Sequence, residues 1–98
     1  KKKFLIVKKK KNSSSFYAKR FAAKEAFTKA LGTGIRKGVN LKNIEISNNV
    51  YGKPLIRLKG NLSRYLKKKI KSSKYDIHLS LSDDKPWAQA TVIISYNK

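Results

Sequence analysis

One acidic side chain stands apart in the basic first part of this chain. Glu25 is the first acidic residue of the sequence, and the next is Glu45. Lys29 follows Glu25 at i,i+4 spacing, and Gly32 and Gly34 come soon after it. On a helix, residues at this spacing project from the same face. An ordinary surface ion pair is one interpretation of the arrangement, and a metal and phosphate site is the other.

The second interpretation depends on ligand chemistry. One hard carboxylate can hold Mg²⁺, which keeps its other positions for water and substrate phosphate. Lys29 and the backbone around Gly32 to Gly34 would then hold phosphate oxygens, with the Thr28 hydroxyl on the same outer face as Glu25. Few residues are needed because phosphoryl transfer depends mainly on positioning and charge neutralisation. As a simple ion pair, Glu25 and Lys29 would contribute only about 0.2–0.5 kcal/mol.

An amphipathic helix that begins at Phe16 has to position these groups. Asn12 to Ser15 supply candidate N-caps for it, and Gly32 is suited to end it in a left-handed C-cap. At 100° per residue, rings and small side chains form one stripe, which predicts the face turned to the core: Phe16, Ala23, Ala26, Phe27 and Ala30.

Alternating and turn-forming segments predict the remaining elements. Val39–Asn49 and Leu55–Leu58 flank a turn-rich stretch and read as a hairpin. A helix is expected from Asn61 to about Ser72, with an apolar face made by Leu62, Tyr65, Leu66 and Ile70. A strand around Ile77–Ser82 and a closing strand at Trp87–Tyr96 would form a second hairpin around Asp83–Pro86.

Composition narrows the class of protein. The chain has 98 residues, which suits a single domain, 1–98, with 1–15 as a basic lead-in segment. It contains no cysteine and one histidine, His78, which excludes thiol chemistry and a His-rich zinc cluster. No apolar run reaches the roughly 18 residues of a membrane span, so we expect a cytoplasmic protein with no membrane contact. The order of elements predicts an α+β fold with an antiparallel sheet.

The net charge of +20, from 25 Lys and Arg against 5 Asp and Glu, predicts an anionic partner. A lysine-biased composition would explain the same excess without a partner. A nucleic-acid-binding module is therefore one hypothesis for function, although the aromatic residues are not interleaved with arginine on a strand face.

The residues Lys19–Gly34, KRFAAKEAFTKALGTG, resemble the signature of holo-acyl-carrier-protein synthases, a family of 4′-phosphopantetheinyl transferases. The resemblance continues through Asn48–Pro54, Ile77–Asp83 and Ala88–Ile94. It implies the fold of that family, an antiparallel sheet packed on a long helix. It also implies transfer of 4′-phosphopantetheine from coenzyme A to a serine of apo-acyl carrier protein, with release of adenosine 3′,5′-bisphosphate.

The resemblance assigns roles to individual residues. Glu25 matches the magnesium ligand, and Glu25 and Lys29 are the expected catalytic pair. Arg20 would bind a phosphate of the cofactor, while Lys29, Thr28, Gly32 and Gly34 line the pyrophosphate. Segments containing Pro54 and His78 would contact the nucleotide end. The family further implies an acidic acyl carrier protein as partner and a homotrimer with active sites between subunits.

One part of the family pattern is missing. Family members begin with a strand whose Gly-x-Asp motif supplies the second metal ligand, followed by a basic helix, and neither is present in this sequence. We therefore expect an N-terminally truncated chain, and a non-catalytic homologue is the third hypothesis. Lys1–Lys11 match a segment that is helical in the family, whereas the periodicity of Phe4–Val7 alone does not separate strand from helix.

Overall fold

The computed structural model describes residues 1–13, 15–32 and 40–97. The elements follow in the order β1 (Lys2–Lys11), α1 (Phe16–Leu31), β2 (Ile44–Asn48), β3 (Pro54–Leu58), α2 (Leu62–Ile70), β4 (Tyr75–Asp84) and β5 (Trp87–Asn97), with a 3₁₀ turn at Leu41–Asn43. Among the described residues, no helix has the length and apolar character needed to span a membrane.

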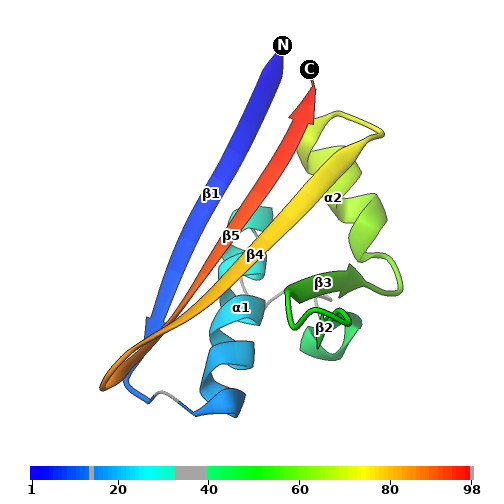
Figure 1. The fold of residues 1–98 in the computed structure, drawn as a ribbon. Coiled ribbons are helices and arrows are strands. Elements are labelled where there is room, and N and C mark those ends of the chain that lie inside the picture. The colour runs from blue at the N-terminus through cyan, green and yellow to red at the C-terminus, as the bar shows by residue number, and fades with distance from the viewer. Residues whose placement is uncertain (14, 33–39, 98) are drawn as a thin grey trace.

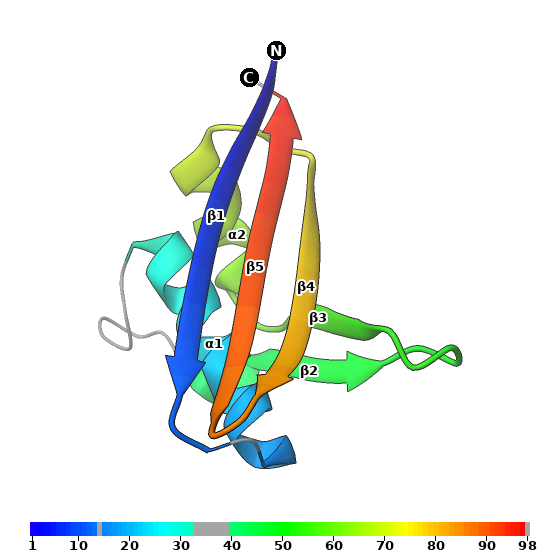
Figure 2. The same cartoon turned by 60° about the vertical axis from the view of Figure 1, so that its left-hand side comes forward.

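A three-stranded antiparallel sheet in the order β1-β5-β4 forms one layer, and both helices lie on the same face of it (Figures 1 and 2). The short β2–β3 ribbon stands beside this pair of layers and extends away from it (Figure 2). The predicted α+β class and the antiparallel sheet packed on a long helix are confirmed.

The core lies between the sheet and the helices. Its largest fully buried side chains are aliphatic or aromatic and come from both helices, β2 and β5: Phe27, Ile44, Leu62, Leu66, Val92 and Ile94. The opposite face of the sheet has no described element over it, and Phe4 and Ile6 are 57% and 60% exposed there. The sheet therefore has one buried face and one open face.

The first segment is a strand, so the helix implied by the family resemblance is wrong for Lys2–Lys11. β1 pairs with β5 along its whole length, from Lys2 opposite Asn97 to Lys11 opposite Ala88. Its odd-numbered residues from Leu5 onward are more buried than their neighbours, which is the period-2 pattern of a strand. Pairing with β5 decided the ambiguity that periodicity left open.

The other elements agree with the sequence apart from their limits. Residues Leu41–Asn43 of the expected strand form the 3₁₀ turn instead, because the Asn40 side chain accepts a hydrogen bond from Lys42 N–H. α2 ends at Ile70, and Lys71 takes a left-handed conformation. On the expected apolar face of α2, Leu62, Leu66 and Ile70 are buried, whereas Tyr65 is 43% exposed.

Candidate functional site

Helix α1 carries the residues of the expected site. Ser15 caps its first turn, since the hydroxyl accepts a hydrogen bond from Ala18 N–H at 3.0 Å. Its small buried residues let the helix pack closely on the sheet: Ala22, Ala23, Ala26 and Ala30. Phe27 is fully buried as predicted, whereas Phe16 is 63% exposed, so its place in the core stripe was wrong. Phe16 lies instead under the Arg20 guanidinium, 4.2 Å from its ring centroid.

Glu25 is paired with the first strand. Its Oε1 atom lies 2.8 Å from Nζ of Lys11, and the two side chains are 18% and 33% exposed. The same Lys11 nitrogen lies 4.7 Å from the ring centroid of Phe21. Oε1 is buried, and no donor meets it with hydrogen-bond geometry, so the contact is an ion pair without a well-directed hydrogen bond. The ion pair of Glu25 therefore reaches across to β1 and does not run along the helix to Lys29.

Lys29 and Thr28 were both expected on the outer face of α1 beside Glu25. Lys29 is exposed in the last turn of α1. Thr28 is only 2% exposed, and its hydroxyl donates a hydrogen bond to the Glu25 carbonyl oxygen at 2.9 Å. The prediction that Thr28 projects outward with Glu25 and Lys29 is therefore wrong. A threonine within a helix can bond back to its own backbone, and burial favours that arrangement.

Gly32 ends the helix as predicted. Its φ of 85° is left-handed, and its N–H donates to the carbonyl oxygens of Thr28 and Lys29. A Cβ at this position would lie 3.0 Å from Nζ of Lys69 on α2. The end of α1 is thus next to a lysine of the second helix. Gly34 lies outside the described residues.

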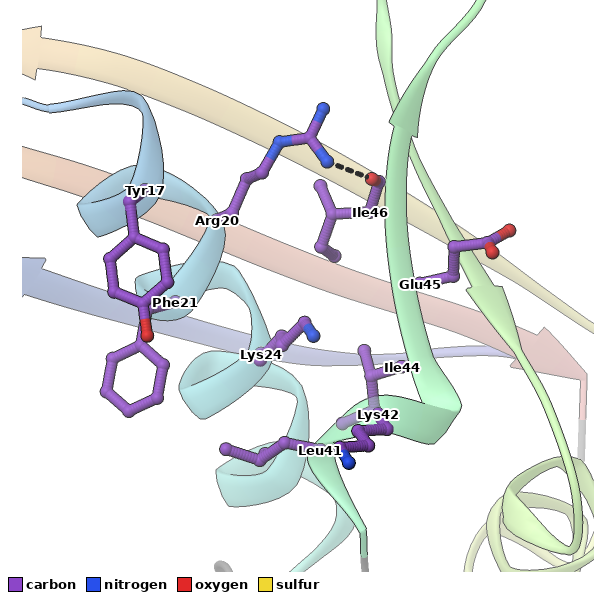
Figure 3. A pocket seen from close by; sticks show the side chains of 9 residues that line it. All are labelled: Tyr17, Arg20, Phe21, Lys24, Leu41, Lys42, Ile44, Glu45 and Ile46. Atoms are coloured by element: carbon purple, nitrogen blue, oxygen red, sulfur yellow. Dashed lines mark hydrogen bonds between the residues drawn. The ribbon is translucent and has the colours of Figure 1, made fainter.

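Arg20 lines a pocket of about 350 Å³ between α1 and the segment that leads into β2 (Figure 3). Its Nη1 donates a hydrogen bond of 2.6 Å to the Ile46 carbonyl oxygen, which ties α1 to β2. Tyr17 and Phe21 stack with their ring planes 8° apart and form part of the wall. The remaining lining residues include two further cations and one acid: Lys24, Leu41, Lys42, Ile44, Glu45 and Ile46.

Pro54 and His78 lie away from Glu25 within the chain. Pro54 begins β3 and pairs with Asn48. His78 is exposed in β4 and alternates with Ile77 and Leu79, which contact the core, so it projects from the open face of the sheet. One chain therefore does not bring His78 and Glu25 together, because the sheet lies between the open face and α1.

Sequence reasoning missed Lys11 and the remainder of the pocket. Lys24 follows Arg20 at i,i+4 spacing, so helix periodicity could have grouped them. Nothing in the run Lys8–Lys11 distinguishes Lys11 from its neighbours. Only the register of β1 against β5 turns Lys11, and not Lys10, toward the helices.

A magnesium ion is the group that the family resemblance implies at Glu25. A buried carboxylate oxygen is a donor that Mg²⁺ accepts. The described residues, however, contain no group of three or more His, Cys, Asp or Glu side chains that could hold a metal. The Lys11 ammonium also contacts the same oxygen. As placed, this set fits an ammonium and does not fit a divalent ion.

Residues 3–92 match the family described as the 4′-phosphopantetheinyl transferase superfamily. A curated relative, the holo-[acyl-carrier-protein] synthase of Pelagibacter ubique, is 45% identical over 90 residues, which are 92% of this chain and 70% of the relative. The chain spans only 59% to 62% of the length of several other curated relatives of the same name.

Solved structures show the same fold. The apo-ACPS of Chronobacterium ammoniagenes superposes with a TM-score of 0.80 at 21% identity, with 100% of each chain covered. A holo-(acyl-carrier-protein) synthase from Bacillus anthracis, solved in complex with CoA (3′,5′-ADP), is 38% identical with a TM-score of 0.63, covering 84% of this chain and 60% of its own. From its match over residues 3–92, this chain belongs to the 4′-phosphopantetheinyl transferase superfamily.

Proposed function

We propose that this protein acts as a holo-acyl-carrier-protein synthase, which transfers 4′-phosphopantetheine from coenzyme A to a serine of apo-acyl carrier protein. The observation that carries the proposal is the 45% identity over 90 residues to a curated enzyme of that name. The arrangement on α1 supports it, because a partly buried carboxylate, a cation and a glycine cap follow one another on one helix.

The reaction is a displacement at phosphorus. The serine oxygen bonds to the phosphorus atom that carries pantetheine, and the bond from that phosphorus to the oxygen of the neighbouring phosphate breaks. The serine proton passes to solvent water, and adenosine 3′,5′-bisphosphate leaves with the bridging oxygen. Both the attacked diphosphate and the leaving group are anionic, so nearby cations stabilise the charge that moves onto the leaving group. Lys29, Gly32 and Gly34 are proposed to line the diphosphate.

Coenzyme A is proposed to bind partly in the pocket of Figure 3. Its volume of about 350 Å³ lies within the range of small-molecule sites and suits a portion of this long cofactor. Arg20, Lys24 and Lys42 supply positive charge, and the Tyr17–Phe21 pair supplies an aromatic wall. The Bacillus anthracis relative was solved with CoA (3′,5′-ADP), which supports a nucleotide ligand for this chain. Pro54 and His78 are proposed to contact the nucleotide end.

Magnesium dependence is part of the proposal, with Glu25 as one ligand. When bound, Mg²⁺ would neutralise charge on the diphosphate. The second carboxylate, which the family supplies from an aspartate, is not in this chain, and the Lys11 ammonium has to leave the Glu25 oxygen before a metal can bind there.

The remaining features fit a cytoplasmic enzyme that works on an acidic carrier protein. The charge of +20 would attract an acyl carrier protein and raise its rate of association. A homotrimer is proposed because the open face of the sheet exposes Phe4 and Ile6. Association through that face would also place His78 near a neighbouring subunit, as an active site between subunits requires.

The decisive experiment measures carrier mass. The protein is incubated with coenzyme A, Mg²⁺ and apo-acyl carrier protein, and mass spectrometry should show addition of one phosphopantetheine to the carrier. Glu25→Gln should lower the rate by at least about 100-fold with an unchanged circular dichroism spectrum. Asp84→Asn, which removes an exposed acid at the end of β4 outside the pocket of Figure 3, is the matched control and should retain activity.

Three outcomes would count against the proposal or a part of it. No mass gain with several apo carriers would favour the non-catalytic homologue. Binding to duplex or single-stranded nucleic acid at physiological salt would favour the nucleic-acid module. Its binding constant should then fall linearly with salt concentration on a log–log plot. A normal rate of transfer by the Glu25→Gln protein would show that Glu25 is not a ligand of the metal.

A further inference from the structure

The contact between Lys11 and Glu25 joins two elements that are separate in the sequence. Lys11 is the last residue of β1 and lies opposite Ala88 of β5 in the ladder. Its side chain projects toward the helix layer, as that of Lys9 does, whereas Lys8 and Lys10 project from the open face. The Lys11 nitrogen reaches Glu25 Oε1 at 2.8 Å.

A second contact fixes the same nitrogen. The Phe21 ring lies one helical turn before Glu25, and its centroid is 4.7 Å from Lys11 Nζ. An aromatic face attracts a cation, and a partly desolvated carboxylate attracts it more strongly. The ammonium is therefore held between the ring and the carboxylate, and both side chains come from α1. The space between the Phe21 ring and the Glu25 carboxylate is therefore a binding position for one cation.

We propose that the Lys11 ammonium occupies the cation position at Glu25 and competes with a divalent metal for that carboxylate. The inference rests on the proposed function only for the assignment of Glu25 as a metal ligand. A metal bonded to Oε1 would lie about 2.0–2.1 Å from it. An ammonium 2.8 Å from the same oxygen would then repel the metal at close range.

The competition has a consequence for the resting chain. While β1 keeps its register, Glu25 is neutralised by a residue of the same chain, and metal binding requires the Lys11 side chain to swing away. Because Oε1 has no other partner with hydrogen-bond geometry, removal of the ammonium leaves an anionic carboxylate whose Oε1 is buried and unpaired. That anion should bind a divalent cation more tightly than the original pair does.

Mn²⁺ binding to the isolated protein tests the proposal. Mn²⁺ is titrated without coenzyme A or carrier, and free Mn²⁺ is followed by electron paramagnetic resonance. Lys11→Met keeps the apolar stem and removes the charge, and we expect it to bind Mn²⁺ about tenfold more tightly than the unmodified chain. Lys10→Met is the matched control, since it removes the same charge from the opposite face of β1, and it should change affinity less than about twofold.

Glu25→Gln completes the test. In the Lys11→Met background it should abolish the gain in affinity, whereas in the unmodified chain it should lower Mn²⁺ affinity by a smaller factor, because Lys11 already competes for that carboxylate there. Lys11→Glu, whose carboxylate ends one bond short of the lysine nitrogen, should bind Mn²⁺ more tightly still, because two carboxylates then face one space. Each variant is checked by circular dichroism, and Mn²⁺ should raise the melting temperature of Lys11→Met and not that of Lys10→Met.

Equal affinities for Lys11→Met and Lys10→Met would overturn the proposal, as would a gain that persists in Lys11→Met with Glu25→Gln. If Lys11→Met does not fold, Lys11→Gln, which also removes the charge, is titrated in its place: a Mn²⁺ affinity equal to that of the unmodified chain would show that Lys11 does not compete with the metal. These measurements do not require transfer activity, so a protein that fails the carrier assay can still pass or fail this test.

Discussion

Single residues at the end of α1 have distinct structural roles. Gly32 holds a left-handed φ of 85°, which a side chain disfavours, and its N–H closes the helix on Thr28 and Lys29. Thr28, expected to face the site, is turned inward and bonded to the Glu25 carbonyl oxygen. The residues in this stretch therefore divide between those that shape the helix and those that face solvent.

Gly32→Ala tests the structural role. We expect a loss of about 1–2 kcal/mol in the free energy of unfolding, because alanine is strained at this φ. Urea unfolding followed by circular dichroism measures it. Gly52→Ala is the matched control, since Gly52 has a φ of 82° and open space around a built Cβ.

Gly32→Ala and Gly52→Ala should lose similar amounts of unfolding free energy, because both replace a glycine with a left-handed φ. The closest neighbour of Gly32 is the flexible end of the Lys69 side chain, which can move aside. A Gly32→Ala protein as stable as the original would show that the left-handed cap is not required.

At the scale of elements, α1 determines where the site lies. Its alanine-rich side packs on β1 and β5, which leaves Phe21, Lys24 and Glu25 half-buried at the margin of the helix. The β1 strand then supplies Lys11, and the segment before β2 supplies the other wall of the pocket. The site is thus built where one helix meets two separate pieces of β structure.

Two phenylalanines of α1 are predicted to differ strongly. Phe27→Ala should cost about 3–5 kcal/mol, because Phe27 is fully buried in the main core. Phe16→Ala should cost about 1 kcal/mol or less, since Phe16 is 63% exposed and loses mainly its contact with Arg20. Chemical denaturation of both variants, side by side, measures the difference. Equal losses of unfolding free energy in the two variants would indicate that Phe16 and Phe27 both belong to the core, as the sequence predicted.

At the scale of the whole molecule, the open face of the sheet exposes apolar side chains that no described element covers. Ile6 of β1, Ile93 of β5 and His78 of β4 lie in one row across the ladder. Ile6 is 60% exposed, although an isoleucine on a sheet is normally covered. The proposed trimer would bury this row and bring His78 to a neighbouring subunit.

Ile6→Lys should therefore shift the protein from trimer to monomer in sedimentation equilibrium, because a charge would be buried in the subunit contact. The monomer should keep its circular dichroism spectrum, since the side chain projects away from the core. Val50→Lys is the matched control: Val50 is 92% exposed at the tip of the β2–β3 hairpin, so the trimer should survive. A trimer that tolerates Ile6→Lys would place the contact elsewhere.

The sequence by itself determined helix α1 and the two hairpins. Periodicity over Phe16–Leu31, with Ser15 and Gly32 at its ends, is a local property, so it predicted the helix, its caps and the burial of Phe27. The two hairpins followed from alternation around turn-forming residues in the same way. The signature around Glu25 indicated the family that the comparison then confirmed.

Only the tertiary structure decided what depends on contacts between distant segments. The run Lys2–Lys11 had no decisive period of its own, and pairing with β5 made it a strand. The register of that pairing chose Lys11 as the partner of Glu25, and packing turned Thr28 inward and Phe16 outward. Contacts of this kind arise when the sheet and helix assemble, so no pattern within one segment contains them.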